Sequence, residues 1–197
     1  GFKCAQGEFV CMISDDCLVI PGAIKNAVKE FDELNQGGKK VGAMPFYWRN
    51  WPVQKNYMIC YAIGDHLHLN HGLYLNQALK DVGYIDEDTF SFYYADSDLS
   101  LKIWDAGYEC VPSEGSYIEH YADANTQVRK SNNLKEREDL DRYKRKWKKY
   151  MSDDEYIGHW KYKDFSDPAK TGELLRNQFY VDTVKKYFYK VMTKILG

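Results

Sequence analysis

The sequence predicts an α/β protein with a mixed β-sheet and a helical extension at its carboxyl end. Short apolar runs alternate with helical spacing over roughly the first 120 residues, which is the pattern of strands and helices packed in layers. After Asn125 the sequence becomes strongly charged and keeps helical spacing. We therefore expect a core at residues 1–124 and a helical extension at residues 125–197.

The elements of the core can be assigned in order. The apolar run Phe9 to Ile13 has the length of a buried strand. Residues 24–34 carry apolar side chains at helical spacing, and the following glycines end that helix. The segment from Trp48 to Gln54 is predicted as a loop, because a proline stands between its aromatic residues. Strands are further expected at 41–47, 57–63, 109–112 and 117–121, and helices at 73–82 and 99–106, with Gly83 and Gly107 as their C-caps.

The extension carries two apolar stripes at helical spacing. Between them, Ser152 to Glu155 has the pattern of a capping box that opens a further helical turn. The first stripe consists of Leu140, Tyr143, Trp147 and Tyr150, and the second of Val184, Phe188, Val191 and Ile195.

Composition excludes several classes of protein. The chain has 197 residues, of which 44% are hydrophobic and 28% charged, and this is ordinary for a globular protein. Its net charge of -2 argues against a general nucleic-acid binder, so no specific nucleic acid is expected as a partner. No run approaches the ~20 apolar residues of a membrane span, and no secretory leader is visible. Five cysteines without a CxxC pair indicate reduced thiols, so we expect a cytoplasmic protein.

The first acidic segment follows the first strand directly. Asp15 and Asp16 stand where ligands gather in open α/β sheets, outside the carboxyl end of a strand. Mg²⁺ and Mn²⁺ take carboxylate oxygens and phosphates in such places. The doublet therefore predicts either a metal that holds a diphosphate or a simple cap of the following turn.

The second acidic segment precedes the helix expected at 99–106. Asp98 suits the start of a helix, where the helix dipole favours anions, and we expect it to support that start. Asp96 is expected to precede the helix and point away from it. A carboxylate in that position can act as a general base toward a hydroxyl nucleophile.

Four segments in this order resemble family 2 glycosyltransferases, which have the GT-A fold. Residues 7–16, ending in Ile-Ser-Asp-Asp, resemble the metal-binding segment of that family. Residues 83–87 (Gly-Tyr-Ile-Asp-Glu), 94–102 (Tyr-Ala-Asp-Ser-Asp-Leu-Ser-Leu-Lys) and 106–108 (Ala-Gly-Tyr) resemble its acceptor segment. His120 stands where many members carry a late histidine. The resemblance implies a GT-A-like, Rossmann-like mixed sheet.

The resemblance also implies roles for single residues. Asp16 would reach the metal, Mg²⁺ or Mn²⁺, and Asp15 would occupy the middle position of the Asp-x-Asp motif. Asp96 would be the catalytic base, and Asp98, in the acceptor segment, would support the helix start. His120 would be a further ligand of the metal or the diphosphate. Sugar rings pack on aromatic faces, and we expect the loop that holds Trp48 and Trp51 to shape the acceptor side.

This sequence departs from the family pattern in three ways. Ser14 replaces the first acid of the Asp-x-Asp motif, and Ala95 replaces the acid that usually precedes the base. No Gln-x-x-Arg-Trp motif is present, which argues against a processive polysaccharide synthase. The half of the family's fold that grips the nucleotide has no counterpart in this sequence. We therefore expect this chain to correspond to the carboxyl-terminal portion of such an enzyme. Without the nucleotide-gripping half, this portion would be inactive alone.

Two further patterns allow alternative interpretations. His66, His68 and His71 form either a zinc site or a polar loop beside the acceptor cleft. The basic run from Arg142 to Lys149 indicates either peripheral contact with an anionic membrane at its inner face or a solvated helix face with Tyr143 and Trp147 packed inward.

The expected function is an inverting, metal-dependent glycosyltransferase. It would move a sugar from a nucleoside-diphosphate sugar to a hydroxyl of a glycan, lipid-linked or protein acceptor. The alternative is a non-catalytic module, derived from such an enzyme, that binds glycans or a partner protein. A nucleotide-gripping segment in the natural polypeptide would favour the enzyme.

Overall fold

The computed structural model describes residues 1–51, 53–121, 126–150 and 160–163, together with Val184, Tyr187, Phe188 and Val191. Residues 1–163 form one compact unit and residues 164–197 a second. The first unit thus runs past residue 124, where we expected the core to end. In the second unit, the four described residues are helical. Ile195 and the Ser152–Glu155 segment lie outside the described residues.

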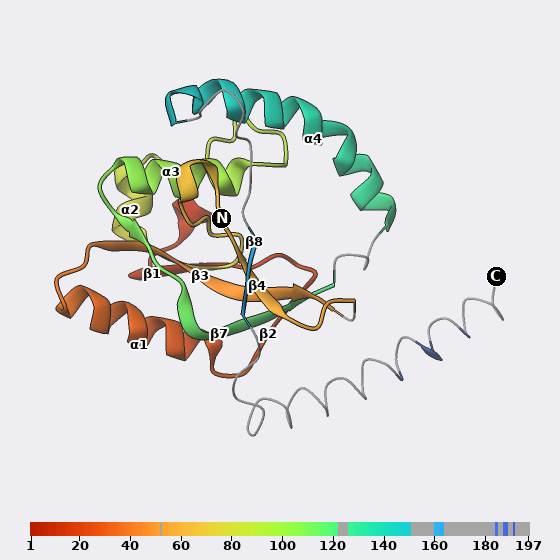
Figure 1. Cartoon of the computed structure of the whole chain (residues 1–197), viewed down its shortest axis with the longest axis horizontal. Coiled ribbons are helices and arrows are strands. Elements are labelled where there is room, and N and C mark those ends of the chain that lie inside the picture. The colour runs from red at the N-terminus through yellow and green to blue at the C-terminus, as the bar shows by residue number, and fades with distance from the viewer. Residues whose placement is uncertain are drawn as a thin grey trace. The chain divides into compact units, whose positions relative to one another are not determined.

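The first unit is built on a mixed sheet around one long central strand, β3 (Figure 1). The first half of β3 pairs with β5 and β6, and its second half pairs with β4 and β7. The pairings with β6 and β7 are parallel, and those with β4 and β5 antiparallel. The strands are β1 (Phe9–Met12), β2 (Cys17–Val19), β3 (Val41–Asn50), β4 (Tyr57–Cys60), β5 (Gly72–Leu75), β6 (Glu109–Cys110), β7 (Ser113–His120) and β8 (Trp160–Lys163).

Helices cover both faces of this sheet (Figure 1). On one face, α1 buries Ala27 and Phe31 against Met44 and Phe46 of β3. On the other face, α2 and α3 pack on β3 and β5. The α-helices of the first unit are α1 (Ala23–Gln36), α2 (Asn76–Asp81), α3 (Ala95–Asp105) and α4 (Thr126–Lys146), and short 3₁₀ turns occupy Phe2–Cys4, Ile63–Asp65 and Lys148–Tyr150.

The ends of α1 follow from its flanking residues. Gly22 adopts a left-handed conformation at the N-cap, with φ of 92°. After the helix, the Asn35 side chain accepts a hydrogen bond from the N–H of Val41 at 3.0 Å. This bond ties the end of α1 to the start of β3, so the helix returns along the strand that it covers.

The fourth helix is anchored to the core by two buried carboxylates. Asp139 of α4 accepts hydrogen bonds from the backbone N–H groups of Ser91, Phe92 and Tyr93 at 2.8–3.1 Å. Asp98 of α3 accepts one from the indole of Trp147 at 2.8 Å. Tyr143 and Trp147 pack in a third apolar cluster, so the inward-packing interpretation of this helix is confirmed.

The structure confirms a mixed α/β fold and corrects four local predictions. Residues 73–75 are part of β5, so the helix expected at 73–82 begins only at Asn76. Trp48 to Asn50 belong to β3 and not to a loop, because β7 and β4 pair with this end of the strand. The α3 helix begins at Ala95, four residues before the expected start. Residues 160–163, expected to be helical, form β8 and pair with β4.

Candidate functional site

The candidate site is built around His120 at the end of β7. The register of the sheet places two polar residues beside it. Cys17 lies opposite His120 across the antiparallel pairing of β2 with β7. Asn50 is its partner in the parallel pairing of β3 with β7. The side-chain oxygen Oδ1 of Asn50 lies 2.8 Å from His120 Nδ1, which is hydrogen-bond distance.

The structure brings Asp16 and His120 together, although 103 residues separate them in the sequence. His120 Nε2 lies 3.3 Å from a carboxylate oxygen of Asp16, and these side chains are 15% and 29% exposed. Asp16 lies in the turn between β1 and β2, and its carbonyl accepts a hydrogen bond from the N–H of Tyr121 at 2.8 Å. Asp15, in the same turn, is exposed to solvent.

His71 forms the buried side of this site. One of its ring nitrogens lies 3.6 Å from the Cys17 sulfur. Burial, followed by the charge of His120, lowers the pKa of His71 to about 4, although the charge of Asp16 partly opposes this shift. Burial, followed by the charge of Asp16, raises the pKa of the Cys17 thiol to about 12. Both groups are therefore neutral near pH 7 in the unliganded protein.

The two tryptophans expected on the acceptor side differ in position. Trp48 lies in β3 with 5% of its surface exposed, and its ring meets the rings of His71 and His120 edge-on. It is a core residue beneath the histidines, which corrects its assignment to an acceptor loop. Trp51 is partly exposed, and its ring centroid lies 5.1 Å from that of Tyr121.

Asp96 lies within the first turn of α3, not before the helix as we expected. One of its carboxylate oxygens accepts the N–H of Ser97 at 2.9 Å. The other lies 3.9 Å from Nε2 of His68, and the Asp96 side chain is 29% exposed. Tyr94, at the N-cap, has a φ of 63°, a conformation that non-glycine residues adopt mainly at constrained sites.

His68 connects Asp96 with the rest of the site. Its pKa is lowered by burial, and the charge of Asp96 opposes this shift. Its Nδ1 is buried and has no hydrogen-bond partner among the described residues. His71 lies close enough to His68, His120 and Asp16 for their charges to act on its pKa. Buried histidines therefore lie on the side of both Asp16 and Asp96.

Asp98 does not face the site. It is fully buried, and Lys146 and Trp147 both lie 2.8 Å from its carboxylate. Asp98 lies in the first turn of α3, at the helix start as we expected, and it also anchors α3 to the carboxyl end of α4. Sequence reasoning missed this role because Lys146 and Trp147 lie nearly fifty residues further along the chain.

The three histidines of the His-x-His-x-x-His run point to different partners. The ring of His66 stacks on Trp104 with 3.5 Å between centroids, His68 faces Asp96, and His71 faces Cys17. Among the residues that the structure describes, these three do not form a metal cluster. The zinc interpretation of this run is thus not supported.

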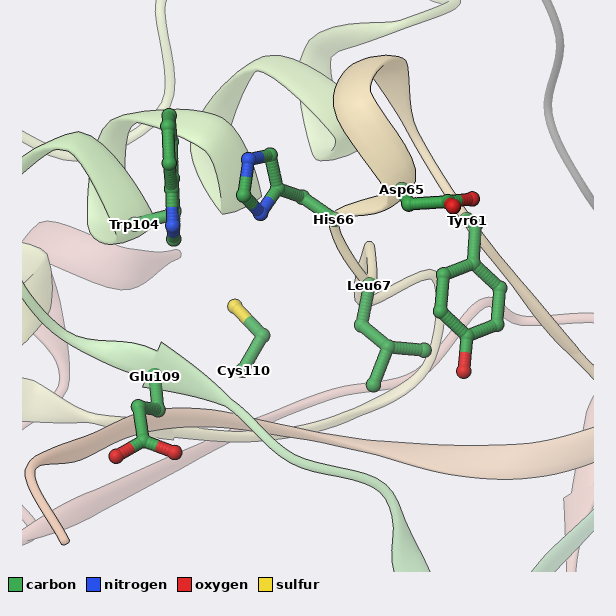
Figure 2. Close-up of a pocket in the computed structure, with 7 residues that line it drawn as sticks. All are labelled: Tyr61, Asp65, His66, Leu67, Trp104, Glu109 and Cys110. Atoms are coloured by element: carbon green, nitrogen blue, oxygen red, sulfur yellow. The ribbon is translucent and has the colours of Figure 1, made fainter.

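A small pocket of about 190 Å³ lies next to His66 (Figure 2). Figure 2 shows the Trp104 and His66 rings on one side and Glu109 and Cys110 on another, with Tyr61 at the rim. Tyr150 meets Trp104 edge-on at 5.1 Å, in addition to the stacked His66. Aromatic neighbours therefore already occupy the surroundings of the Trp104 ring.

Three of the six basic residues between Arg142 and Lys149 pair with acids in the described part of the chain. Arg142 bonds Asp139, Lys146 bonds Asp86 and Asp98, and Lys149 lies 3.5 Å from Asp105. Within the described residues, no helix is long and apolar enough to cross a membrane. Half of the six basic residues thus pair with acids of this chain, and peripheral membrane contact of the run stays a prediction.

Asp16, Cys17 and His120 offer three ligand atoms that lie within 4.8 Å of one another. A carboxylate and an imidazole are suitable ligands for Mn²⁺, whereas Mg²⁺ prefers an all-oxygen environment. The residues present therefore fit Mn²⁺ better than Mg²⁺. The sequence analysis found Asp16 and His120 and singled out His68 and His71 within the His-x-His-x-x-His run, but it missed Cys17 and Asn50. For Cys17, the one visible signal was its position next to Asp16.

The comparisons with known proteins give no family assignment: no protein-family model matches the chain, and no curated protein or solved structure matches it significantly.

Proposed function

We propose that this chain is the acceptor- and metal-binding part of an inverting glycosyltransferase that uses a nucleoside-diphosphate sugar. One observation carries the proposal: Asp16 and His120, which the family resemblance implies as ligands of the metal and diphosphate, lie 3.3 Å apart at the end of β7. A partly exposed carboxylate and an imidazole at this distance can share a divalent cation.

Asp96 would act on the acceptor. Its partly exposed carboxylate would take the proton of the acceptor hydroxyl while that oxygen attacks the anomeric carbon and the bond to the diphosphate breaks. The Ser97 N–H orients one carboxylate oxygen, and His68 lies on the side of the other. A bound Mn²⁺ or Mg²⁺ would offset the negative charge that develops on the leaving diphosphate.

The alternative, a non-catalytic glycan-binding module, would use an aromatic surface. The pocket beside Trp104 is the one described feature that favours it. However, the His66 ring lies against the Trp104 ring, tilted by 33° with 3.5 Å between centroids, which leaves little free aromatic face for a sugar. Saturation-transfer NMR with a glycan panel tests this alternative: transfer to a glycan that is lost in Trp104→Ala, without any sugar transfer activity, would favour it.

The experiment for the proposed function measures release of nucleoside diphosphate by the natural polypeptide, with Mn²⁺ and a panel of sugar donors and acceptors. Asp16→Ala should abolish metal-dependent transfer and leave folding intact, because the Asp16 side chain lies outside the core. Asp32→Ala, an exposed acid on α1, is the matched control and should keep activity. Wild-type transfer by Asp16→Ala would contradict the proposal.

A further inference from the structure

The donor atoms around His120 include sulfur, which the family resemblance does not imply. The Cys17 sulfur lies 3.8 Å from one carboxylate oxygen of Asp16, and the other oxygen lies 3.3 Å from His120 Nε2. All three ligand atoms lie within 4.8 Å of one another. An oxygen, a sulfur and a nitrogen donor therefore converge from the turn after β1, from β2 and from β7.

The separations are close to the edges of a tetrahedral zinc centre. With Zn–N and Zn–O distances of about 2.0–2.1 Å and a Zn–S distance of about 2.3 Å, the edges are about 3.3 Å for N···O and about 3.6 Å for S···O. The observed N···O separation of 3.3 Å involves one carboxylate oxygen of Asp16 and the S···O separation of 3.8 Å involves the other, so the carboxylate must rotate for a single oxygen to complete both edges.

The surroundings hold the ligands in place. Asn50 Oδ1 lies at hydrogen-bond distance from His120 Nδ1, and this contact leaves His120 Nε2, which faces Asp16, to bind the metal. Before metal arrives, the Cys17 thiol donates a hydrogen bond to Asp16 at 3.8 Å, and a ring nitrogen of His71 lies 3.6 Å from the Cys17 sulfur. The Asp16 side chain is 29% exposed, so the fourth coordination position of the metal remains open to water or a ligand oxygen.

We infer that Asp16, Cys17 and His120 form a Zn²⁺ site with three protein ligands and one open position. A thiolate ligand selects Zn²⁺ over Mg²⁺ and Mn²⁺, and the stability order of divalent ions favours Zn²⁺ over Mn²⁺ at mixed N, O and S donors. The Cys17 thiol releases its proton to solvent as the Zn–S bond forms. The binding of Zn²⁺ does not depend on whether the protein transfers sugars. We expect bound Zn²⁺ to displace Mn²⁺ and abolish sugar transfer, and this consequence rests on the proposed function.

The test is titration of the 197-residue chain with Co²⁺, a spectroscopic substitute for Zn²⁺. A thiolate bound to Co²⁺ gives a charge-transfer absorption in the near ultraviolet. We expect this band to saturate at one Co²⁺ per chain, to disappear on addition of Zn²⁺, and to persist in excess Mg²⁺. No band in the wild-type chain, or its loss to excess Mg²⁺, would overturn the inference.

Cysteine substitutions identify which residue supplies the sulfur ligand. Cys17→Ser should remove the band, whereas the matched control Cys4→Ser, at an exposed cysteine in the first turn, should keep it. A band that survives in Cys17→Ser would assign the metal to another cysteine and contradict the site. Asn50→Ala should keep the band and weaken Zn²⁺ binding about 10–100-fold, the usual effect of removing an outer partner of a ligand.

A measurement on the unaltered chain covers the case in which Cys17→Ser fails to fold. Zn²⁺ should slow alkylation of Cys17 by iodoacetamide, followed by peptide mass spectrometry, and leave the rate at Cys4 unchanged. Equal rates at Cys17 with and without Zn²⁺ would contradict the inference. If the chain does not bind Zn²⁺ but Mn²⁺-dependent sugar transfer is observed, only this inference is lost. If the chain binds Zn²⁺ but no Mn²⁺-dependent sugar transfer is observed, only the proposed function is lost.

Discussion

Trp147 donates its indole N–H to the Asp98 carboxylate of α3 at 2.8 Å, and this carboxylate has no exposed surface. Lys146, the last residue of α4, supplies the positive charge that a buried carboxylate requires. The helix that carries Asp96 is thereby fixed to the far end of α4. Asp98 thus stabilises the element that positions the proposed base, although it takes no part in the chemistry.

Removal of this buried carboxylate should destabilise the fold. Asp98→Ala leaves the indole N–H unpaired and Lys146 without one of its two acidic partners. We expect a loss of about 3–5 kcal/mol in the free energy of unfolding, the usual cost of breaking a buried ion pair. Urea denaturation followed by tryptophan fluorescence measures it.

The control for this prediction is Asp105→Ala at the other end of α3. Asp105 pairs with Lys149 at the surface, where such pairs contribute about 0–1 kcal/mol. If both variants lose the same stability, the Asp98 pair is not the anchor that its burial indicates.

Asp139 should make stability depend on pH. Burial alone would raise its pKa, but bonds from three backbone N–H groups and from Arg142 outweigh burial, and the pKa is lowered. A lowered folded-state pKa contributes stability above the unfolded pKa of about 3.9, and this contribution is lost as pH falls through the folded value. Asp139→Asn should cost about 2–3 kcal/mol at neutral pH.

The free energy of unfolding, measured by urea denaturation at several pH values, checks the direction of this pH dependence. The difference between wild type and Asp139→Asn should be constant near pH 7 and shrink below about pH 4. A difference that grows as the pH falls would show that the Asp139 carboxylate is not stabilised by the loop before α3.

Gly72 should not tolerate a side chain. It follows His71, and a Cβ at this position would lie 2.2 Å from the carbonyl oxygen of Met44. Gly72→Ala must push β5 away from β3, at a cost of about 3 kcal/mol. Thermal unfolding followed by circular dichroism measures the loss.

Gly37→Ala is the matched glycine control, because its φ of -74° suits any residue and its new Cβ would lie 3.3 Å from the nearest atom. It should change stability by less than about 1 kcal/mol. If Gly72→Ala is as stable as the wild type, β5 can move away from β3 at little cost, and the prediction for Gly72 is wrong.

The sequence was sufficient to predict elements whose signals are local. The apolar run at Phe9, the helical spacing of α1 and the glycine ends at Gly83 and Gly107 all appear in the structure. The start of α2 was wrong because Leu73 to Leu75 are apolar and their pairing with β1 and β3 is set by distant strands. Likewise, β8 forms by pairing with β4, about one hundred residues earlier.

The candidate site was predictable only where a motif marked it. Asp16 and His120 were named from the resemblance, and the structure places them in contact. Cys17, Asn50 and His71 join them through the register of β2, β3 and β5, which no local pattern contains. Trp48 was assigned to a loop because its aromatic and proline neighbours resemble one, yet parallel pairing with β7 buries it.

The most direct test of the central claim is the rate of sugar transfer by Asp96→Asn in the natural polypeptide. Asn keeps the size of Asp96 but cannot accept the proton of the acceptor hydroxyl, so transfer should fall by about 10² or more while donor binding stays nearly unchanged. Circular dichroism confirms that the variant is folded. Transfer by Asp96→Asn at the wild-type rate would contradict the account, because the proton would then leave by another route.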